Sequence, residues 1–129
     1  MRASIVLLLV FCSCDAPKDA LVQSCRKEAL TPGGRCTLSA GALKSRQSAY
    51  VDANTKNDKV RVEAAFSVAK GRVAVTVTGC DEVTVTPEQP ATLTCDAALN
   101  RRNYTFHVET APRGGSAEGF AGTLSFTPL

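Results

Sequence analysis

The stretch that most constrains this chain is residues 73–95, in which apolar and hydroxyl side chains alternate along three short runs. The runs read VAVTVT, EVTVT and ATLTC, and turn-forming clusters separate them. Alternation with a period of two places the apolar side chains on one face of a β-strand and the threonines on the other. The stretch therefore predicts a β-meander with one dry face, which the rest of the chain is expected to cover.

The same alternation recurs on both sides of this stretch. Apolar or small residues occupy every second position in five further runs: 36–40, 49–53, 60–68, 104–108 and 120–126. Residues 19–29 fit a short helix or an irregular strand equally well. Short strands at close spacing, without a long helical pattern, predict an all-β domain: an antiparallel β-sandwich of about seven or eight short strands.

Turn residues suggest which of these runs are neighbours. The sequence Ala69-Lys70-Gly71 predicts a tight hairpin between runs 60–68 and 72–78. Residues 87–90 read PEQP and predict a second hairpin, between the second and third runs of the meander. Residues 111–119 are rich in glycine and are expected to form a flexible loop.

The expected core follows from the inward positions of the runs. Aromatic residues are scarce, with five Phe, two Tyr and no Trp, so aliphatic side chains must supply most of the buried area. The predicted core residues are Val60, Val62, Phe66, Val73, Val75, Val77, Val83, Val85, Leu93, Tyr104, Phe106, Val108, Leu124 and Phe126.

The amino terminus has the order of an export signal. Arg2 supplies a positive start, residues 5–11 are an unbroken apolar run, and small or polarisable residues follow. The run is much shorter than the 18 or more apolar residues of a membrane-spanning helix. The leader is therefore expected to direct the chain out of the cytoplasm.

The apolar run ends in FCSC, which resembles the lipobox of a bacterial lipoprotein signal. Ser13 stands where that family has a small residue, and the resemblance implies that Cys14 is acylated and becomes the first mature residue. Ordinary signal cleavage after Ala16 is the alternative. The resulting division is 1–14 as the signal, 15–24 as a tether and 25–129 as the β-sandwich domain.

Four cysteines remain beyond the leader: Cys25, Cys36, Cys80 and Cys95. An even number in an exported chain favours disulfides. Each of the pairs Cys25–Cys36 and Cys80–Cys95 flanks a predicted turn, so this local pairing is expected. A zinc site is disfavoured because no C-x-x-C pair is present and the chain has a single histidine.

Two segments resemble immunoglobulin-like and fibronectin-type domains. Residues 82–95, EVTVTPEQPATLTC, are similar to an immunoglobulin strand pair that ends in its first core cysteine. Residues 104–108, YTFHV, are similar to a fibronectin-type strand that begins at a corner tyrosine. The resemblance implies an immunoglobulin-like β-sandwich.

The sequence offers no recognisable catalytic or cofactor site. His107, the lone histidine, occupies an outward position of its predicted strand, and no G-x-S-x-G nucleophile turn is present. The formal net charge of +3 and the lack of aromatic residues among the basic ones argue against nucleic acid as a partner. We expect no catalytic residues, no metal and no cofactor.

These observations predict a non-enzymatic cell-envelope lipoprotein whose β-sandwich docks a protein partner, with an edge strand as the contact. The N-terminal lipid would hold it at the periplasmic side of a membrane. The alternative is a freely secreted module that binds a small ligand between its sheets.

The anchor can be tested by the intact mass of the mature protein. We expect an N-terminus at Cys14 that carries diacylglycerol, because several acyl chains give stable membrane attachment whereas one chain gives only reversible binding. Cys14→Ala should release the protein from the membrane fraction or leave it as precursor. An unmodified N-terminus at Pro17 would contradict the anchor.

Overall fold

A computed structural model describes residues 20–27 and 33–129, and all the regular structure in this part of the chain is β-strand. Eight strands form one antiparallel sheet. Their bounds are β1 Val22–Lys27, β2 Gly34–Leu43, β3 Gln47–Asp52, β4 Lys59–Ser67, β5 Lys70–Val77, β6 Val83–Val85, β7 Ala91–Ala98 and β8 Thr105–Pro128. The all-β prediction is confirmed, and the ambiguous segment at residues 19–29 contains the strand β1.

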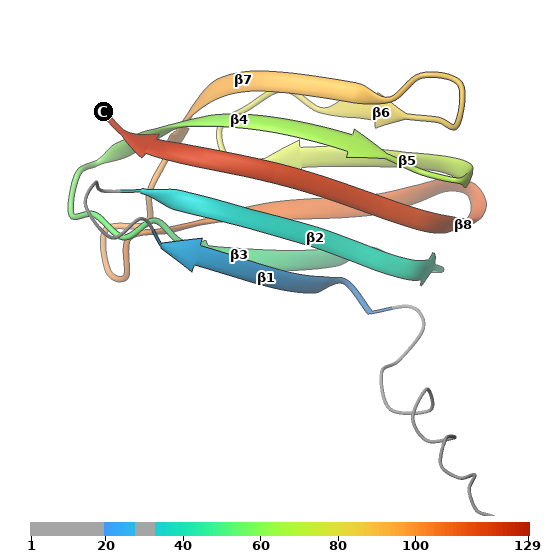
Figure 1. Cartoon of the computed structure of the whole chain (residues 1–129), viewed down its shortest axis with the longest axis horizontal. Coiled ribbons are helices and arrows are strands. Elements are labelled where there is room, and N and C mark those ends of the chain that lie inside the picture. Colours follow the sequence, from blue (N-terminus) through green and yellow to red (C-terminus); the bar gives the residue numbers. More distant parts are fainter. Residues whose placement is uncertain (1–19, 28–32) are drawn as a thin grey trace, which may run out of the picture.

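The sheet folds over into two layers because β8 runs through both of them (Figure 1). Residues 117–128, the second half of β8, pair with β2 and β4. β1 pairs with β2, and β7 pairs with β4, which completes the front layer. Residues 105–113, the first half of β8, pair with β3 and β5, and β6 completes the back layer.

The strand pairs are nested around the turn between β5 and β6. β5 pairs with β6, β4 with β7, β3 with the first half of β8, and β2 with its second half. A long hairpin wrapped into two layers in this way has the topology of a jelly roll. In an immunoglobulin domain the strands divide between the sheets in a different order. The immunoglobulin-like sandwich is thus not confirmed.

Two expected pairs of consecutive strands are not neighbours in the sheet. β4 and β5 lie in different layers, so Ala69-Lys70-Gly71 carries the chain between layers instead of closing a hairpin. β7 pairs with β4 and not with β6, so residues 73–95 do not form a meander and residues 87–90 also connect the layers. The turn residues were recognised correctly, but a turn does not determine whether the strands beside it pair.

Inward side chains of both layers form one hydrophobic core. The Phe106 ring of the back layer meets the Phe126 ring of the front layer edge-on, with their centroids 5.5 Å apart. Eleven of the fourteen predicted core residues are buried, and the other three are half-buried against the core: Val83, Leu93 and Tyr104. Val83 lies on β6, and Leu93 lies on β7. Both are half-buried because β6 has only three residues, so the back layer leaves β7 partly uncovered.

The glycine-rich segment 111–119, expected to be a loop, forms the corner of β8. Gly119 has a φ of 69°, and a side chain there would meet Ala69 Cβ at 2.7 Å. Further along, Gly122 lies directly opposite Phe66. A Cβ at Gly122 would approach the Phe66 ring to 2.5 Å, so this glycine makes room for a core aromatic residue.

Truncation of a core phenylalanine should test this packing. We expect Phe66→Ala or Phe106→Ala to lower the free energy of unfolding by about 3–5 kcal/mol, because each leaves a cavity that the surrounding strands cannot fill. Denaturant unfolding measures the change. Tyr50→Ala, at a side chain that is 65% exposed, is the matched control and should cost much less. Equal losses for the three variants would contradict the assigned core.

Candidate functional site

The sequence-predicted site residues divide into one that lies outside the described residues and four that form bridges. Cys14 belongs to the first group. Cys25 is bonded to Cys36, and Cys80 is bonded to Cys95. The structure thus has the two local pairs expected from the turns.

The two bridges join different parts of the fold. Cys25 and Cys36 are directly opposite each other on β1 and β2, so their bridge holds the edge strand of the front layer. Cys80 lies in the turn before β6, and Cys95 lies on β7. Their bridge therefore links the back layer to the front layer on the side of the molecule where β6 and β7 lie.

His107 is held in a local network at the back layer. Its Nδ1 lies 3.0 Å from Thr78 Oγ1, and its backbone N–H donates to the same oxygen at 2.9 Å. The Thr78 backbone N–H donates to the carbonyl of His107. The Thr78 hydroxyl thus serves to fasten the turn after β5 to β8, which is a structural role.

The described residues include ion pairs but no candidate metal site. Within residues 20–27 and 33–129, no group of three or more His, Cys, Asp or Glu is placed to hold a metal ion. On the front layer, Arg61 Nε donates to Asp96 Oδ1 at 3.0 Å, and this hydrogen bond raises the pKa of the Arg61 guanidinium. Both side chains are exposed, so the pair contributes little to stability.

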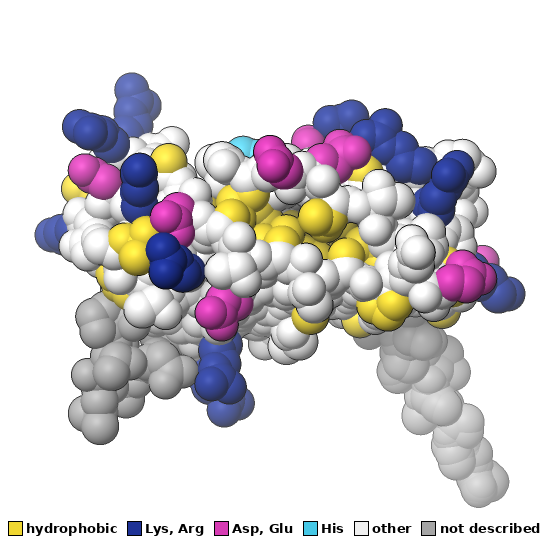
Figure 2. Space-filling model, turned by 90° about the horizontal axis from the view of Figure 1, so that it is seen from above, with side chains coloured by type: hydrophobic (Ala, Val, Ile, Leu, Met, Phe, Trp, Pro, Cys, Tyr) yellow, Lys and Arg dark blue, Asp and Glu magenta, His cyan; other side chains and the backbone are white. Residues whose placement is uncertain are grey.

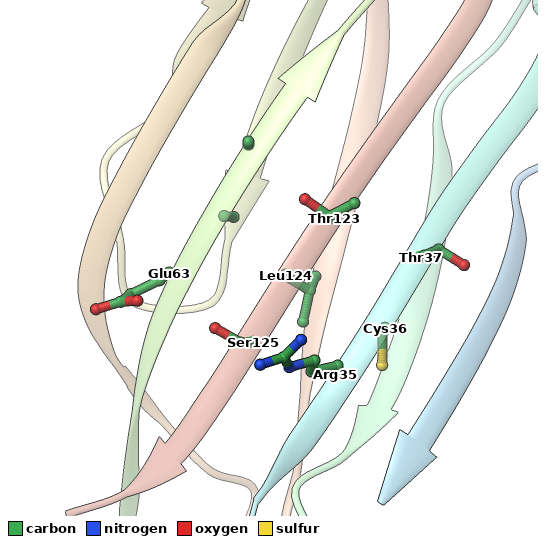
Figure 3. Close-up of a pocket in the computed structure, with 9 residues that line it drawn as sticks. Arg35, Cys36, Thr37, Glu63, Thr123, Leu124 and Ser125 are labelled. Carbon is green, nitrogen blue, oxygen red and sulfur yellow. The ribbon is translucent and has the colours of Figure 1, made fainter.

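Two adjoining shallow hollows lie over the central strands of the front layer. One has a volume of about 560 Å³ and is bordered by Arg35, Glu63 and Ser125 (Figure 3). The other, of about 490 Å³, continues along the same strands past Ser39 and Ser67. Both are shallow because the side chains over β8 are small. We call the outward side chains of β2, β4 and the second half of β8 the front face.

The edges of the two layers differ in how open they are. β6 has only three residues and is followed by Pro87. At the edge strand β3, the Gln23 side chain donates from Nε2 to the Tyr50 carbonyl at 2.8 Å. Along β6 and β7, hydrophobic side chains lie in the middle of the surface with charged groups around them (Figure 2). Within the described residues, β1 and β7 are the edge strands of the front layer, and all the β1 side chains from Val22 to Arg26 are exposed.

Few residues of the front face and of the β1 edge could be predicted from the sequence. The alternation in run 60–68 places Arg61 and Glu63 on the outward face, and both are exposed, but nothing in the sequence singles out Arg35, Gln23 or Thr123. Residues of the front face come from strands far apart in the chain. Only the pairing of β2 and β4 with β8 brings them together.

Comparison of the chain with protein-family models, with curated proteins and with solved structures finds no match. Two disulfides indicate an oxidising extracellular or envelope environment. Residues 20–27 and 33–129 include no helix long and apolar enough to cross a membrane.

Removal of each bridge should show its separate contribution. A disulfide that closes a loop of this length stabilises by about 3 kcal/mol on the chain-entropy model. We expect Cys25→Ala with Cys36→Ala, and separately Cys80→Ala with Cys95→Ala, each to lower the melting temperature, and reduction of the wild-type protein to lower it further. Peptide mapping without reductant that recovered Cys25 linked to Cys80 would contradict the pairing.

Proposed function

We propose that this chain is a non-enzymatic, lipid-anchored lipoprotein of the bacterial cell envelope that docks a protein partner by strand addition at β1. The observation that carries the proposal is the accessible edge of β1. Within the described residues, β1 pairs with β2 on one side and with no strand on the other. An exposed edge of this kind offers unpaired backbone groups to an extended segment of another chain.

The register identifies which backbone groups β1 offers. The Cα atoms of Cys25 and Cys36 are 4.0 Å apart. In an antiparallel ladder the closer pairs are those that do not hydrogen-bond to each other. The N–H and C=O groups of Cys25 therefore point away from β2, and so do those of Gln23 and Lys27, two residues away on either side. These groups would pair with the partner's strand.

The disulfide supports this use of β1. An edge strand of six residues is easily frayed, and strand addition requires that it stay in place. The bond from Cys25 to Cys36 fixes β1 at its centre, and the Gln23 side chain ties it to the carbonyl of Tyr50 in the back layer. A partner would therefore meet a pre-ordered edge.

The membrane part of the proposal rests on the leader and on the position of β1. If Cys14 is the acylated residue, only residues 15–21 separate the lipid from β1. The docking edge would then lie close to the periplasmic side of a membrane. Cleavage after Ala16 would make the same domain a secreted protein with the same edge.

The alternative function, a secreted module with a small ligand between its layers, has less support. The space between the layers holds the buried rings of Phe66, Phe106 and Phe120. The two hollows described above lie on the outer surface instead. The strand order is that of a jelly roll, so the immunoglobulin resemblance of residues 82–95 and 104–108 has no bearing on the docking edge.

Site-specific photocrosslinking in cells would test the docking edge. A photoreactive residue at Val22 should give one adduct of discrete mass, whereas the same residue at Lys56, on the exposed loop after β3, should not. Gln23→Pro should abolish the adduct, because proline removes an outward N–H donor yet is tolerated at the free side of an edge strand.

The control for this variant is Gln23→Ala. It removes the side-chain hydrogen bond to Tyr50 but keeps the backbone N–H, so the adduct should persist. Loss of the adduct in both variants would show that the side chain and not the strand edge is recognised. An adduct of equal yield from Lys56 would also contradict docking at β1.

A further inference from the structure

We propose that the front face binds a second copy of this chain, face to face, in a two-fold symmetric dimer. The two-fold axis runs along the second half of β8, so that Arg35 of each copy meets Glu63 of the other. The inference does not depend on the proposed function, because it uses a different surface from the edge of β1.

The registers place the charged residues symmetrically about β8. Arg35 on β2 and Glu63 on β4 both lie opposite Ser125. The three residues therefore form one row across the front face, with β8 in the middle. A two-fold rotation about β8 exchanges the columns of β2 and β4 and keeps each row in place, which brings Arg35 over the second copy's Glu63 in two equivalent contacts.

The next two rows are compatible with the same rotation. Thr37 and Ala65 flank Thr123, and Ser39 and Ser67 flank Ala121. The rotation places Thr37 over Ala65, Ser39 over Ser67, and the β8 residues over their own copies. All these side chains are small, so two sheets can approach at the separation of about 10 Å that is usual for stacked sheets.

Within the described residues of one chain, Arg35 has no opposite charge beside it, and Glu63 has only the attraction of Arg61, which is already hydrogen-bonded to Asp96. Arg35 lies directly opposite Arg26 on β1, and like charges at such positions repel. Within the described residues, neither Arg35 nor Glu63 forms a salt bridge. Their strands are two spacings apart, about 9.5 Å, and Figure 3 shows the Glu63 carboxylate directed away from Arg35, toward β7.

Charge also selects this axis over the other possible one. An axis that runs across the strands through the middle row would place Arg35 near Ser39 and Glu63 near Ser67 of the second copy, which leaves both charges unpaired. The Arg61–Asp96 pair lies beyond the row of Arg35 and Glu63 and is neutral in itself, so it opposes neither arrangement.

Charge reversal tests the inference on the exported chain purified with its disulfides formed. Sedimentation velocity over a range of concentrations should show a monomer–dimer equilibrium. Arg35→Glu or Glu63→Arg should each raise the dimer Kd at least about tenfold, because each creates two like-charge contacts. Combined in one chain, they should restore the Kd to within about threefold. Lys56→Glu, on an exposed loop, makes the same charge change and should leave the Kd unaltered.

Crosslinking tests the position of the axis. A cysteine introduced as Thr123→Cys should be joined to its copy by a short thiol-to-thiol crosslinker, since it lies on the axis. The control Thr94→Cys lies two strands from β8 on the β7 edge, so the two copies would be about 19 Å apart in this direction and should not be joined.

The combined results either establish the front face as a dimer interface or exclude it. Dimerisation with rescue by the double reversal and crosslinking at Thr123 alone would establish the interface. A monomer at all concentrations, or a dimer whose Kd is unchanged by Arg35→Glu, would overturn the proposed interface. A monomer whose Arg35→Glu variant loses the partner crosslinked at β1 would assign the front face to that partner instead of a second copy.

Discussion

Both layers of the fold depend on the backbone pairing of β8. Its first half lies between β3 and β5, and its second half lies between β2 and β4. Each half is thus an inner strand of its layer, with hydrogen-bonded neighbours on both sides. The corner between the halves is compact because Gly119 allows the chain to pass close to Ala69. Since one strand serves both layers, the layers are joined through the corner of β8 as well as through their shared core.

The sequence predicted which residues are strands and which of them face inward. Val60, Val62 and Phe66 alternate with polar residues, and the structure buries all three. It did not predict the partners of the strands. Alternation reports the two faces of a strand, whereas pairing depends on segments far apart in the chain, such as β2 and the end of β8. Leu93 is half-buried for a related reason, because β6, which contacts β7 from the other layer, has only three residues.

The disulfides were predictable where the strand pairing was not. Cys80 and Cys95 were paired on the assumption of a hairpin between β6 and β7, and the structure has the bond without that hairpin. The bond instead spans the two layers. Proximity along the chain was sufficient here, because a short connection keeps its ends close whether or not the strands beside it hydrogen-bond. The front face required more, since Arg35 and Glu63 become members of one row only through a third strand.

The nested order of the strands has a consequence for synthesis. A ribosome releases β2, β3, β4 and β5 first, yet the inner strand of each layer belongs to β8 at the far end of the chain. Until β8 is complete, β2 and β4 have no common neighbour, and neither layer can close. Long-range pairing of this kind folds slowly. Neither layer can therefore be completed before β8 has been translated, so the strand order itself keeps synthesis and folding apart in time.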